Sequence, residues 1–139
     1  MSEFSISTDK SKLDLTAVHG YLSNKSYWAK GRSLETIRIS IENSIAFGMY
    51  DSKGKQVGFA RVATDMAVFA YLMDVYILDE YQGNGLGKQL MNYIMNHPPL
   101  KAISKIRLAT ADAHKFYEQF GFVAITRPDD LMEVMNNAN

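Results

Sequence analysis

A glycine-rich segment at residues 82–88 has the clearest capacity for chemistry in this sequence. It reads Gln82-Gly83-Asn84-Gly85-Leu86-Gly87-Lys88. Alternating glycines let the backbone adopt conformations closed to other residues and approach a ligand closely. The segment follows a long apolar stretch and opens a helical pattern, so unpaired backbone N–H groups converge at the positive end of a helix. We therefore expect it to bind a phosphate or pyrophosphate, with Lys88 adding a positive charge.

Two other phosphate-binding loops do not fit the same residues. The dinucleotide fingerprint G-x-G-x-x-G fails because Lys88 stands where its third glycine would be. The P-loop G-x-x-x-x-G-K-[ST] needs a glycine at that position too, and fails for the same reason. A glycine-rich turn that serves only tight packing between a strand and a helix stays as the alternative interpretation.

The composition limits the remaining chemistry. The chain has 139 residues, of which 47% are hydrophobic and 22% charged, and this is typical of one folded domain, here residues 1–139. Absence of cysteine excludes disulfides, thiolate nucleophiles and cysteine-ligated metals. The three histidines lie far apart in the sequence, so we expect no metal site.

The charges and the apolar stretches indicate the class of partner and the location. Fifteen Lys and Arg balance fifteen Asp and Glu, so no basic excess favours a nucleic-acid partner. The longest apolar stretches are too short to cross a membrane. The first residues lack the basic and apolar parts of a signal peptide. We therefore expect a cytoplasmic protein without a nucleic-acid or membrane partner.

The hydrophobic pattern predicts a mixed α/β layer that positions the glycine segment. Alternation predicts a short strand near residues 4–6, and a turn cluster predicts a hairpin of strands at 45–50 and 57–64. Residues 69–78 form the most apolar segment, which predicts a central strand buried on both faces. Shorter strands are predicted at 106–109, 122–126 and 131–135. Helical spacing predicts helices after the capping residues Asp14, Ser33 and Thr110, and over 85–96. Residues 34–41 also fit strand spacing, so both interpretations stay open there.

Two motifs together resemble the GNAT N-acetyltransferase superfamily. Residues 82–87 are similar to the acyl-CoA signature (Q/R)-x-x-G-x-(G/A) of that family. Residues 113–122, AHKFYEQFGF, are similar to its A-x-x-x-Y-x-x-x-G-F element and lie at the right distance downstream. An apolar strand precedes the first motif and an amphipathic helix follows it. The resemblance covers residues 45–122 well and the N-terminal third loosely.

This resemblance implies the GNAT fold, in which helices flank a central, mostly antiparallel sheet of about six to seven strands. The fourth strand splays from the fifth, and acetyl-CoA lies in the gap without a metal. The backbone just before the loop would bind the pantetheine, and the loop would bind the pyrophosphate. The implied cofactor-binding residues are Val75, Tyr76, Ile77, Gln82, Gly83, Asn84, Gly85, Leu86, Gly87, Lys88, His114 and Tyr117.

Tyr117 corresponds to the family's tyrosine near the cofactor sulfur, where it would return a proton to the leaving thiolate. A phenol with a pKa near 10 is protonated at neutral pH and suits this role. The alternative is an apolar core stripe that includes Phe116 and Phe120. His114 lies three residues before Tyr117 on nearly the same helical face, and would orient the cofactor or relay a proton. A purely structural role is its alternative.

Asp74 is the candidate general base, because it is a lone carboxylate in an apolar strand, where burial disfavours the charged form. Strict alternation places Asp74 with Leu72 and Tyr76, opposite the odd-numbered residues 71–77. Asp74 is structural if the amine attacks from that other face. Asp65, at the turn before the strand, or a relayed water is the alternative base.

The resemblance places the acceptor site between the N-terminal helices, the central strands and the last hairpin. The residues expected to line it are Tyr27, Trp28, Arg32, Phe59 and Arg61. The aromatic pair would cover an amine by cation–π contact. For Trp28, a core plug under the loop is the alternative.

The implied activity is transfer of an acetyl group from acetyl-CoA to a primary amine of a small molecule or a peptide. Attack would be direct, in a ternary complex, because no cysteine can carry the acyl group. The alternatives are transfer from a longer acyl-CoA and a non-catalytic acyl-CoA sensor. A homodimer is left open.

Overall fold

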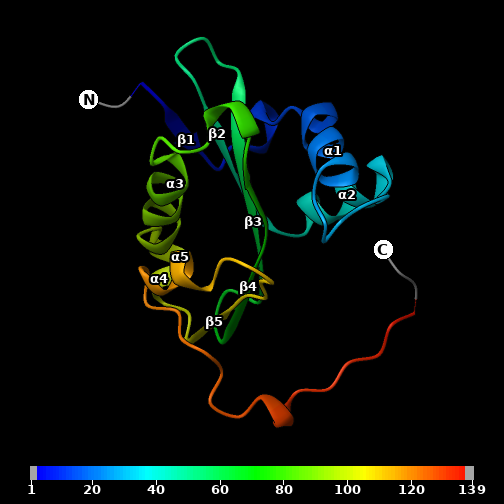
Figure 1. Ribbon diagram of the computed structural model, residues 1–139, viewed down its shortest axis with the longest axis vertical. Coiled ribbons are helices and arrows are strands. Elements are labelled where there is room, and N and C mark those ends of the chain that lie inside the picture. Colours follow the sequence, from blue (N-terminus) through cyan, green and yellow to red (C-terminus); the bar gives the residue numbers. More distant parts are fainter. Residues whose placement is uncertain (1–2, 137–139) are drawn as a thin grey trace.

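The computed structural model describes residues 3–136 and arranges them around a five-stranded sheet (Figure 1). The strands stand in the order β1 (Ser5–Ser7), β2 (Ile45–Tyr50), β3 (Gln56–Thr64), β4 (Phe69–Ile77) and β5 (Lys105–Arg107). Neighbouring strands are antiparallel except for β4 and β5, which are parallel. The predicted mixed α/β class is confirmed, but within the described residues the sheet has five strands rather than six or seven.

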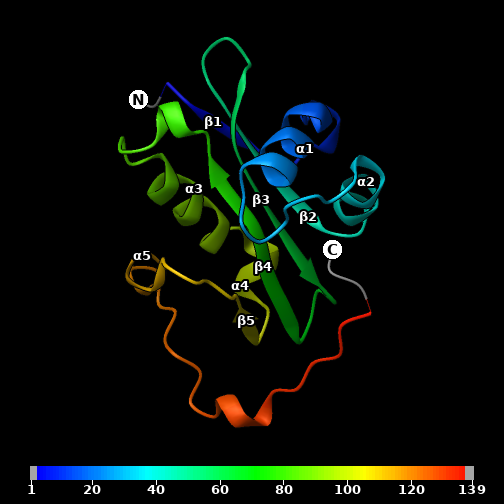
Figure 2. The same cartoon turned by 45° about the vertical axis from the view of Figure 1, so that its right-hand side comes forward.

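Helices cover both faces of this sheet (Figure 2). They are α1 (Leu15–Asn24), α2 (Leu34–Glu42), α3 (Leu86–Met95), α4 (Pro98–Lys101) and α5 (His114–Glu118), with 3₁₀ turns η1 (Lys10–Lys12), η2 (Asp79–Tyr81) and η3 (Pro128–Asp130). One core cluster packs the sheet against α3 and contains Phe47, Leu90 and Ile94. A second cluster packs the opposite face against α1 and α2. The sheet is therefore the middle layer that positions both sets of helices.

The first two helices begin where the sequence predicts. The Asp14 carboxylate accepts the N–H of Ala17 at 3.0 Å, and the Ser33 hydroxyl accepts the N–H of Thr36 at 3.1 Å. Segment 34–42 is a helix and not a strand. Its isoleucines at helical spacing are buried, whereas Ile39 is 47% exposed, which is the pattern of an amphipathic helix.

The C-terminal end differs from the prediction. Segments 122–126 and 131–135 were expected to be strands, but residues 122–136 form an extended arm in which only η3 is regular. No described strand pairs with this arm, and a strand needs a partner for its backbone groups. We call residues 122–136 the C-terminal arm; it is the orange and red ribbon that arches away from the sheet (Figure 1). The preceding helix, α5, also starts later than expected, at His114, although Thr110 accepts the N–H of Ala113 at 3.1 Å.

Candidate active site

Strands β4 and β5 separate soon after they meet. Their ladder joins residues 69–71 to residues 105–107 only. Beyond Tyr71, no described strand pairs with this edge of β4. Its backbone N–H and C=O groups are therefore available to a ligand that enters the gap. This separation agrees with the predicted splay of the fourth and fifth strands.

A β-bulge interrupts β4 at Asp74. Phe59 pairs with Tyr76 and Arg61 pairs with Met73, so one residue of β3 faces two residues of β4. The φ angle of Asp74 is 58°, in the left-handed region that non-glycine residues rarely adopt. Such strain often accompanies functional sites.

This bulge corrects the predicted alternation of side chains. Strict alternation places Leu72, Asp74 and Tyr76 on one face. In the structure Leu72 packs in the core cluster against α3, whereas Tyr76 packs in the cluster against α1 and α2. Asp74 bonds to residues of the α1–α2 loop, on the same side as Tyr76. The extra residue reverses the pattern in mid-strand.

Asp74 is the centre of a buried ionic cluster and is not the lone charge that the sequence suggested. Its carboxylate accepts from Nε of Arg61 at 2.6 Å, from Nη1 of Arg32 at 3.0 Å and from the indole N–H of Trp28 at 2.9 Å. Asp74 is 4% exposed and Arg61 is 9% exposed. These three hydrogen bonds tie β3 and the α1–α2 loop to the bulge.

The glycine loop before α3 forms a backbone cradle. Gly83 and Gly85 have φ angles of 85° and 77°, which favour glycine. The first N–H groups of α3 have no intrahelical acceptor, and no side chain caps the helix at Gly85. Gln82 donates from Nε2 to the carbonyl of Ile77 at 2.9 Å and thereby ties the loop to the end of β4.

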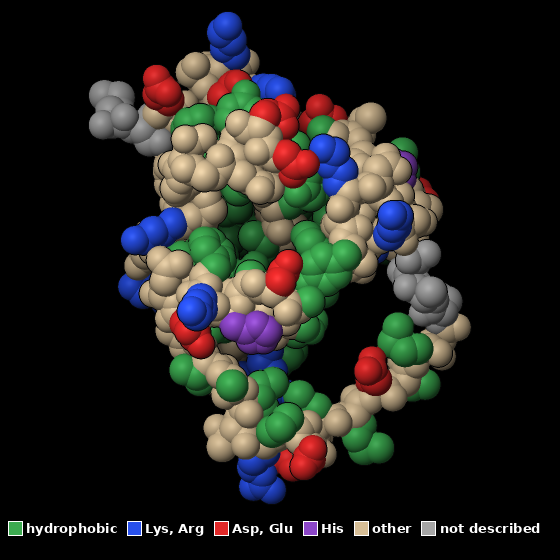
Figure 3. Space-filling view, viewed as in Figure 1, with side chains coloured by type: hydrophobic (Ala, Val, Ile, Leu, Met, Phe, Trp, Pro, Cys, Tyr) green, Lys and Arg blue, Asp and Glu red, His purple; other side chains and the backbone are tan. Residues whose placement is uncertain are grey.

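A cavity of about 630 Å³ runs from this loop along the splayed part of β4; we call it the cofactor cavity. It opens in the hollow between α3 and the α1–α2 side of the molecule (Figure 3). Its lining is Tyr21, Trp28, Val75, Tyr76, Ile77, Tyr81, Gln82, Gly83, Gly85, Leu86, Gly87, Lys88, Asp112, Ala113, Phe116, Tyr117 and Gln119. All predicted cofactor-binding residues line it except Asn84 and His114.

Those two residues lie outside the cofactor cavity. The amide of Asn84 donates to the carbonyl of Tyr81 at 3.3 Å within the loop. His114 is exposed at the first position of α5. For His114 this placement favours the structural alternative over a relay.

A second cavity of about 560 Å³, which we call the acceptor cavity, meets the first at Tyr117. Its lining is Tyr27, Trp28, Arg32, Tyr71, Leu72, Met73, Asp74, Val75, Leu108, Ala109, Thr110, Ala111, Asp112, Ala113 and Tyr117. The two cavities share Trp28, Val75, Asp112, Ala113 and Tyr117. A ligand in each cavity would therefore meet the other at these residues.

Tyr117 stands at this junction and is half-buried. Burial, and after it the neighbouring Tyr27 and Asp112, raise the pKa of its phenol to about 12. Its ring packs edge-on against Phe116 at a centroid distance of 5.1 Å and against Phe122 at 6.1 Å. Tyr117 thus packs in the apolar stripe and also lines both cavities.

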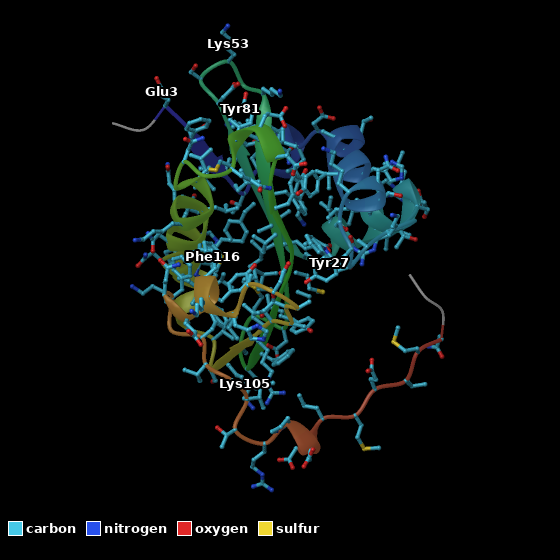
Figure 4. All side chains as sticks on the ribbon, in the orientation of Figure 1. Glu3, Tyr27, Lys53, Tyr81, Lys105 and Phe116 are labelled. Atoms are coloured by element: carbon cyan, nitrogen blue, oxygen red, sulfur yellow. The ribbon has the colours of Figure 1, made fainter. Side chains whose placement is uncertain are left out.

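Tyr27 links the α1–α2 loop to the loop after β5. Its hydroxyl accepts the N–H of Ala111 at 3.0 Å, and its ring stands edge-on to Trp28 at 5.1 Å. Figure 4 places Tyr27 on the side of α1 and α2, and Phe116 on the side of α5. The hydrogen bond therefore spans the gap between the two sides of the site.

Three other predicted residues do not line either cavity. Phe59 is fully buried in the core cluster that contains Tyr76, and Arg61 is bonded to Asp74. Asp65 is exposed at the turn before β4, where its carboxylate accepts the N–H groups of residues 67–69. These bonds lower the pKa of Asp65, which makes it a weaker base.

Sequence reasoning missed Asp112, an exposed carboxylate that lines both cavities. It immediately precedes Ala113, the first residue of the second motif, and that adjacency is the signal that could have found it. Sequence reasoning also did not assign Met73 to the acceptor site, although Met73 lines the acceptor cavity.

Metal binding and membrane insertion find no support in the described part of the chain. Within residues 3–136, no group of three or more His, Asp or Glu is placed to hold a metal ion. None of the helices there is long and apolar enough to span a membrane.

Comparisons with known proteins point to one family. The sequence profile of the acetyltransferase (GNAT) domain matches residues 42–124. A Xanthomonas campestris pv. campestris protein of solved structure, assigned to the GNAT family, is 42% identical, with a TM-score of 0.93 over 97% of this chain and 94% of that chain. That coverage extends into the C-terminal arm.

Curated relatives agree with this match. An uncharacterized N-acetyltransferase of Gracilaria tenuistipitata var. liui is 35% identical over 84% of this chain and 72% of its own length. Serotonin N-acetyltransferase 2 of Oryza sativa subsp. japonica is 29% identical over 86% of this chain and 61% of its own length.

Proposed function

The chain belongs to the GNAT acetyltransferase family, and we propose that it transfers an acetyl group from acetyl-CoA to a primary amine in a ternary complex. The observation that carries this proposal is the meeting of two cavities at Tyr117. One cavity ends on the uncapped N-terminus of α3, and the other is lined by aromatic and acidic side chains. The site can therefore hold two ligands with their reactive ends together.

Acetyl-CoA fits the cofactor cavity by its chemistry. The N–H groups of the glycine loop and the charge of Lys88 suit a pyrophosphate, and the unpaired edge of β4 suits the amides of pantetheine. When bound, acetyl-CoA supplies a thioester whose acetyl carbon is attacked by the amine nitrogen, so that a C–N bond forms as the C–S bond breaks. A strand N–H on the open edge would stabilise the developing oxyanion.

Tyr117 would supply the proton that the leaving sulfur needs. Because burial raises the pKa of its phenol to about 12, Tyr117 stays protonated at neutral pH. It lines both cavities, and this supports a role beside the bond that would break. We therefore assign it the role of general acid.

The acceptor side would attract and hold a cationic amine. The exposed carboxylate of Asp112 lies where the cavities meet, and the rings of Tyr27 and Trp28 offer cation–π contact. A water would take the proton of the incoming amine. We propose that Asp74 is a positioning residue, because its carboxylate already accepts from Arg61, Arg32 and Trp28.

A panel of amines tests this function. Purified protein is incubated with acetyl-CoA and each amine, and free thiol is measured. The panel includes serotonin because a relative is a serotonin N-acetyltransferase, and a lysine peptide represents peptide amines. We expect amine-dependent thiol release that falls sharply in Tyr117→Phe. Binding of CoA without thiol release from any amine would favour a sensor, and faster turnover of a longer acyl-CoA would favour that donor.

A further inference from the structure

The ionic cluster around Asp74 contains two arginines but only one carboxylate. Arg61 and Arg32 both pair with Asp74, and among the described residues neither arginine forms an ion pair with any other acidic group. The cluster therefore keeps one positive charge in excess. All three side chains are largely buried, and a charge without a counter-ion in such surroundings attracts an anion.

Arg61 uses its guanidinium entirely within the protein. Its Nε donates to Asp74 at 2.6 Å, its Nη1 to the Ser44 hydroxyl at 3.2 Å and its Nη2 to the Met73 sulfur at 3.5 Å. Arg61 does not line the acceptor cavity, whereas Arg32 does. A ligand in that cavity therefore meets the excess charge at Arg32.

Arg32 keeps one edge of its guanidinium free. Both of its hydrogen bonds to Asp74 come from Nη1, at 3.2 and 3.0 Å, and its Nε and Nη2 have no acceptor among the described residues. Within residues 3–136, the Tyr50 hydroxyl is the only buried side-chain nitrogen or oxygen without a partner, so these two nitrogens of Arg32 are accessible. The N–H bonds of Nε and Nη2 are parallel, and this edge of a guanidinium binds the two oxygens of a carboxylate side by side.

The acceptor cavity separates this positive edge from a negative group. Asp112 lines both cavities, whereas Arg32 lines the acceptor cavity alone and is the only cationic residue in its lining. The rest of the lining is largely apolar and includes Tyr71, Met73 and Leu108. The volume of about 560 Å³ lies in the range of small-molecule sites. An acceptor with its amine beside Asp112 can therefore extend a negative group to Arg32 and an apolar group into the cavity.

We infer, on the basis of the proposed function, that the acceptor is a free amino acid with an apolar side chain, whose carboxylate binds the Nε and Nη2 edge of Arg32. Its amino group lies beside Asp112 and Tyr117. A carboxylate fits better than a phosphate, because its single negative charge matches the single positive charge in excess. In the transfer a C–N bond forms and the C–S bond breaks. Of the two protons that the ammonium loses, one ends on the CoA thiol and the other in water.

Matched acceptors test this assignment on the natural chain. The kcat/KM is measured by thiol release for phenylalanine and leucine, for their amides, and for phenethylamine and isopentylamine, which lack the carboxylate. We expect each amino acid to exceed its amide and its amine by about ten- to a hundredfold, the range of a hydrogen bond to a charged group. Equal or faster turnover of the amides or amines would overturn the assignment and leave the proposed function intact. So would faster turnover of phosphoethanolamine than of either amino acid.

Variants of Arg32 test the residue itself, and the ratio of kcat/KM for amino acid over amide is the measured quantity. Arg32→Gln should bring this ratio close to one and keep CoA affinity, because Arg32 does not line the cofactor cavity. Trp28→Phe is the matched control: it removes another hydrogen bond to Asp74 but leaves the guanidinium, so the ratio should be kept. Arg32→Lys keeps a charge for Asp74 without the two-pronged edge, and should lose most of the ratio. An unchanged ratio in either Arg32 variant would overturn the assignment.

Binding separates the carboxylate site from the proposed function. Calorimetry in the presence of CoA measures the affinity for N-acetylphenylalanine and for its amide, which differ only at the carboxylate. We expect the acid to bind at least about tenfold more tightly than the amide, and this difference to disappear in Arg32→Gln. Such binding without acetyl transfer to any amine would refute the proposed function but support the carboxylate site. Equal binding of the acid and the amide would refute the carboxylate site, whatever the turnover.

Discussion

The cofactor cavity and the acceptor cavity meet at Tyr117, but they are built in different ways. The cofactor cavity takes most of its lining from one stretch, residues 75–88, whose shape depends on glycine backbone conformations. The acceptor cavity is assembled from segments around residues 27–32, 71–75 and 108–113, which the ionic cluster of Asp74 and the bond from Ala111 to Tyr27 hold together. A local site thus depends on backbone geometry, and an assembled site depends on long-range side-chain contacts.

The largest effect is expected on stability, from a change in the ionic cluster that holds the acceptor cavity together. Asp74→Ala leaves Arg61 and Arg32 without their carboxylate, and breaking such a buried pair costs about 3–5 kcal/mol of unfolding free energy. Urea unfolding measures the loss. Asp79→Ala is the control, because its pair with Lys25 is exposed and should contribute little. Equal stability of the Asp74 variant and the natural chain would show that the cluster does not hold this side together.

The next effect tests the junction between the two sides. Tyr117→Phe keeps the ring packing and removes the proton donor, so we expect kcat to fall by about ten- to a thousandfold, with little change in CoA affinity. Steady-state kinetics and calorimetry measure the two quantities. Tyr93→Phe, an exposed tyrosine on α3 outside both cavities, should behave as the natural chain. Natural turnover in the Tyr117 variant would leave this residue with a packing role alone.

A third change acts on the glycine loop of the cofactor cavity. Gly85 has a φ angle of 77°, which a β-branched residue adopts only with strain, so Gly85→Val should distort the loop. We expect CoA affinity, measured by calorimetry, to fall by more than about tenfold, since close approach of a pyrophosphate needs this backbone. Gly20→Ala, in α1, should keep the affinity. An unchanged affinity in a folded Gly85 variant would remove the loop from the site.

A smaller effect is expected where one hydrogen bond joins the two sides of the site. Tyr27→Phe removes the acceptor of the Ala111 N–H but keeps the aromatic ring. One exposed hydrogen bond contributes on the order of 0.5–1 kcal/mol, so the KM for the amine should rise about two- to fivefold. CoA affinity should stay within error. A larger loss of CoA affinity than of amine affinity would contradict the division between the cavities.

The smallest effect is expected from pH: between about pH 7 and 10, ionisation of Tyr117 should leave turnover unchanged. The pKa of Tyr117 is about 12 in the folded chain and near 10 when unfolded, so folding favours the neutral phenol. Its contribution to stability is fully present below about pH 10 and is lost as the pH rises toward about 12. Turnover should therefore show no decline from Tyr117 between about pH 7 and 10. A decline in that range that disappears in Tyr117→Phe would contradict the assigned pKa shift.

Local rules predicted the parts of the molecule that a few neighbouring residues decide. Asp14 and Ser33 cap the helices that the sequence assigned to them, and the glycine loop lies between β4 and α3 as expected. The predicted strands after Gly121 did not form, although their residues are mostly apolar. An apolar composition favours a strand, but a strand also needs backbone partners on a neighbouring segment, and the described arm pairs with none.

The sequence by itself determined the capped helices, the hairpin of β2 and β3, and the glycine loop with its conformations, because these depend on bonds within a few residues. Only the tertiary structure decided the bulge in β4, the partners of Asp74 and the course of the C-terminal arm. Asp74 bonds to residues 13, 42 and 46 positions away, and no local pattern encodes contacts of that separation. They form when the sheet aligns β3 with β4 and packs the α1–α2 loop against both. The lining of the acceptor cavity therefore follows from the tertiary structure and not from local sequence patterns.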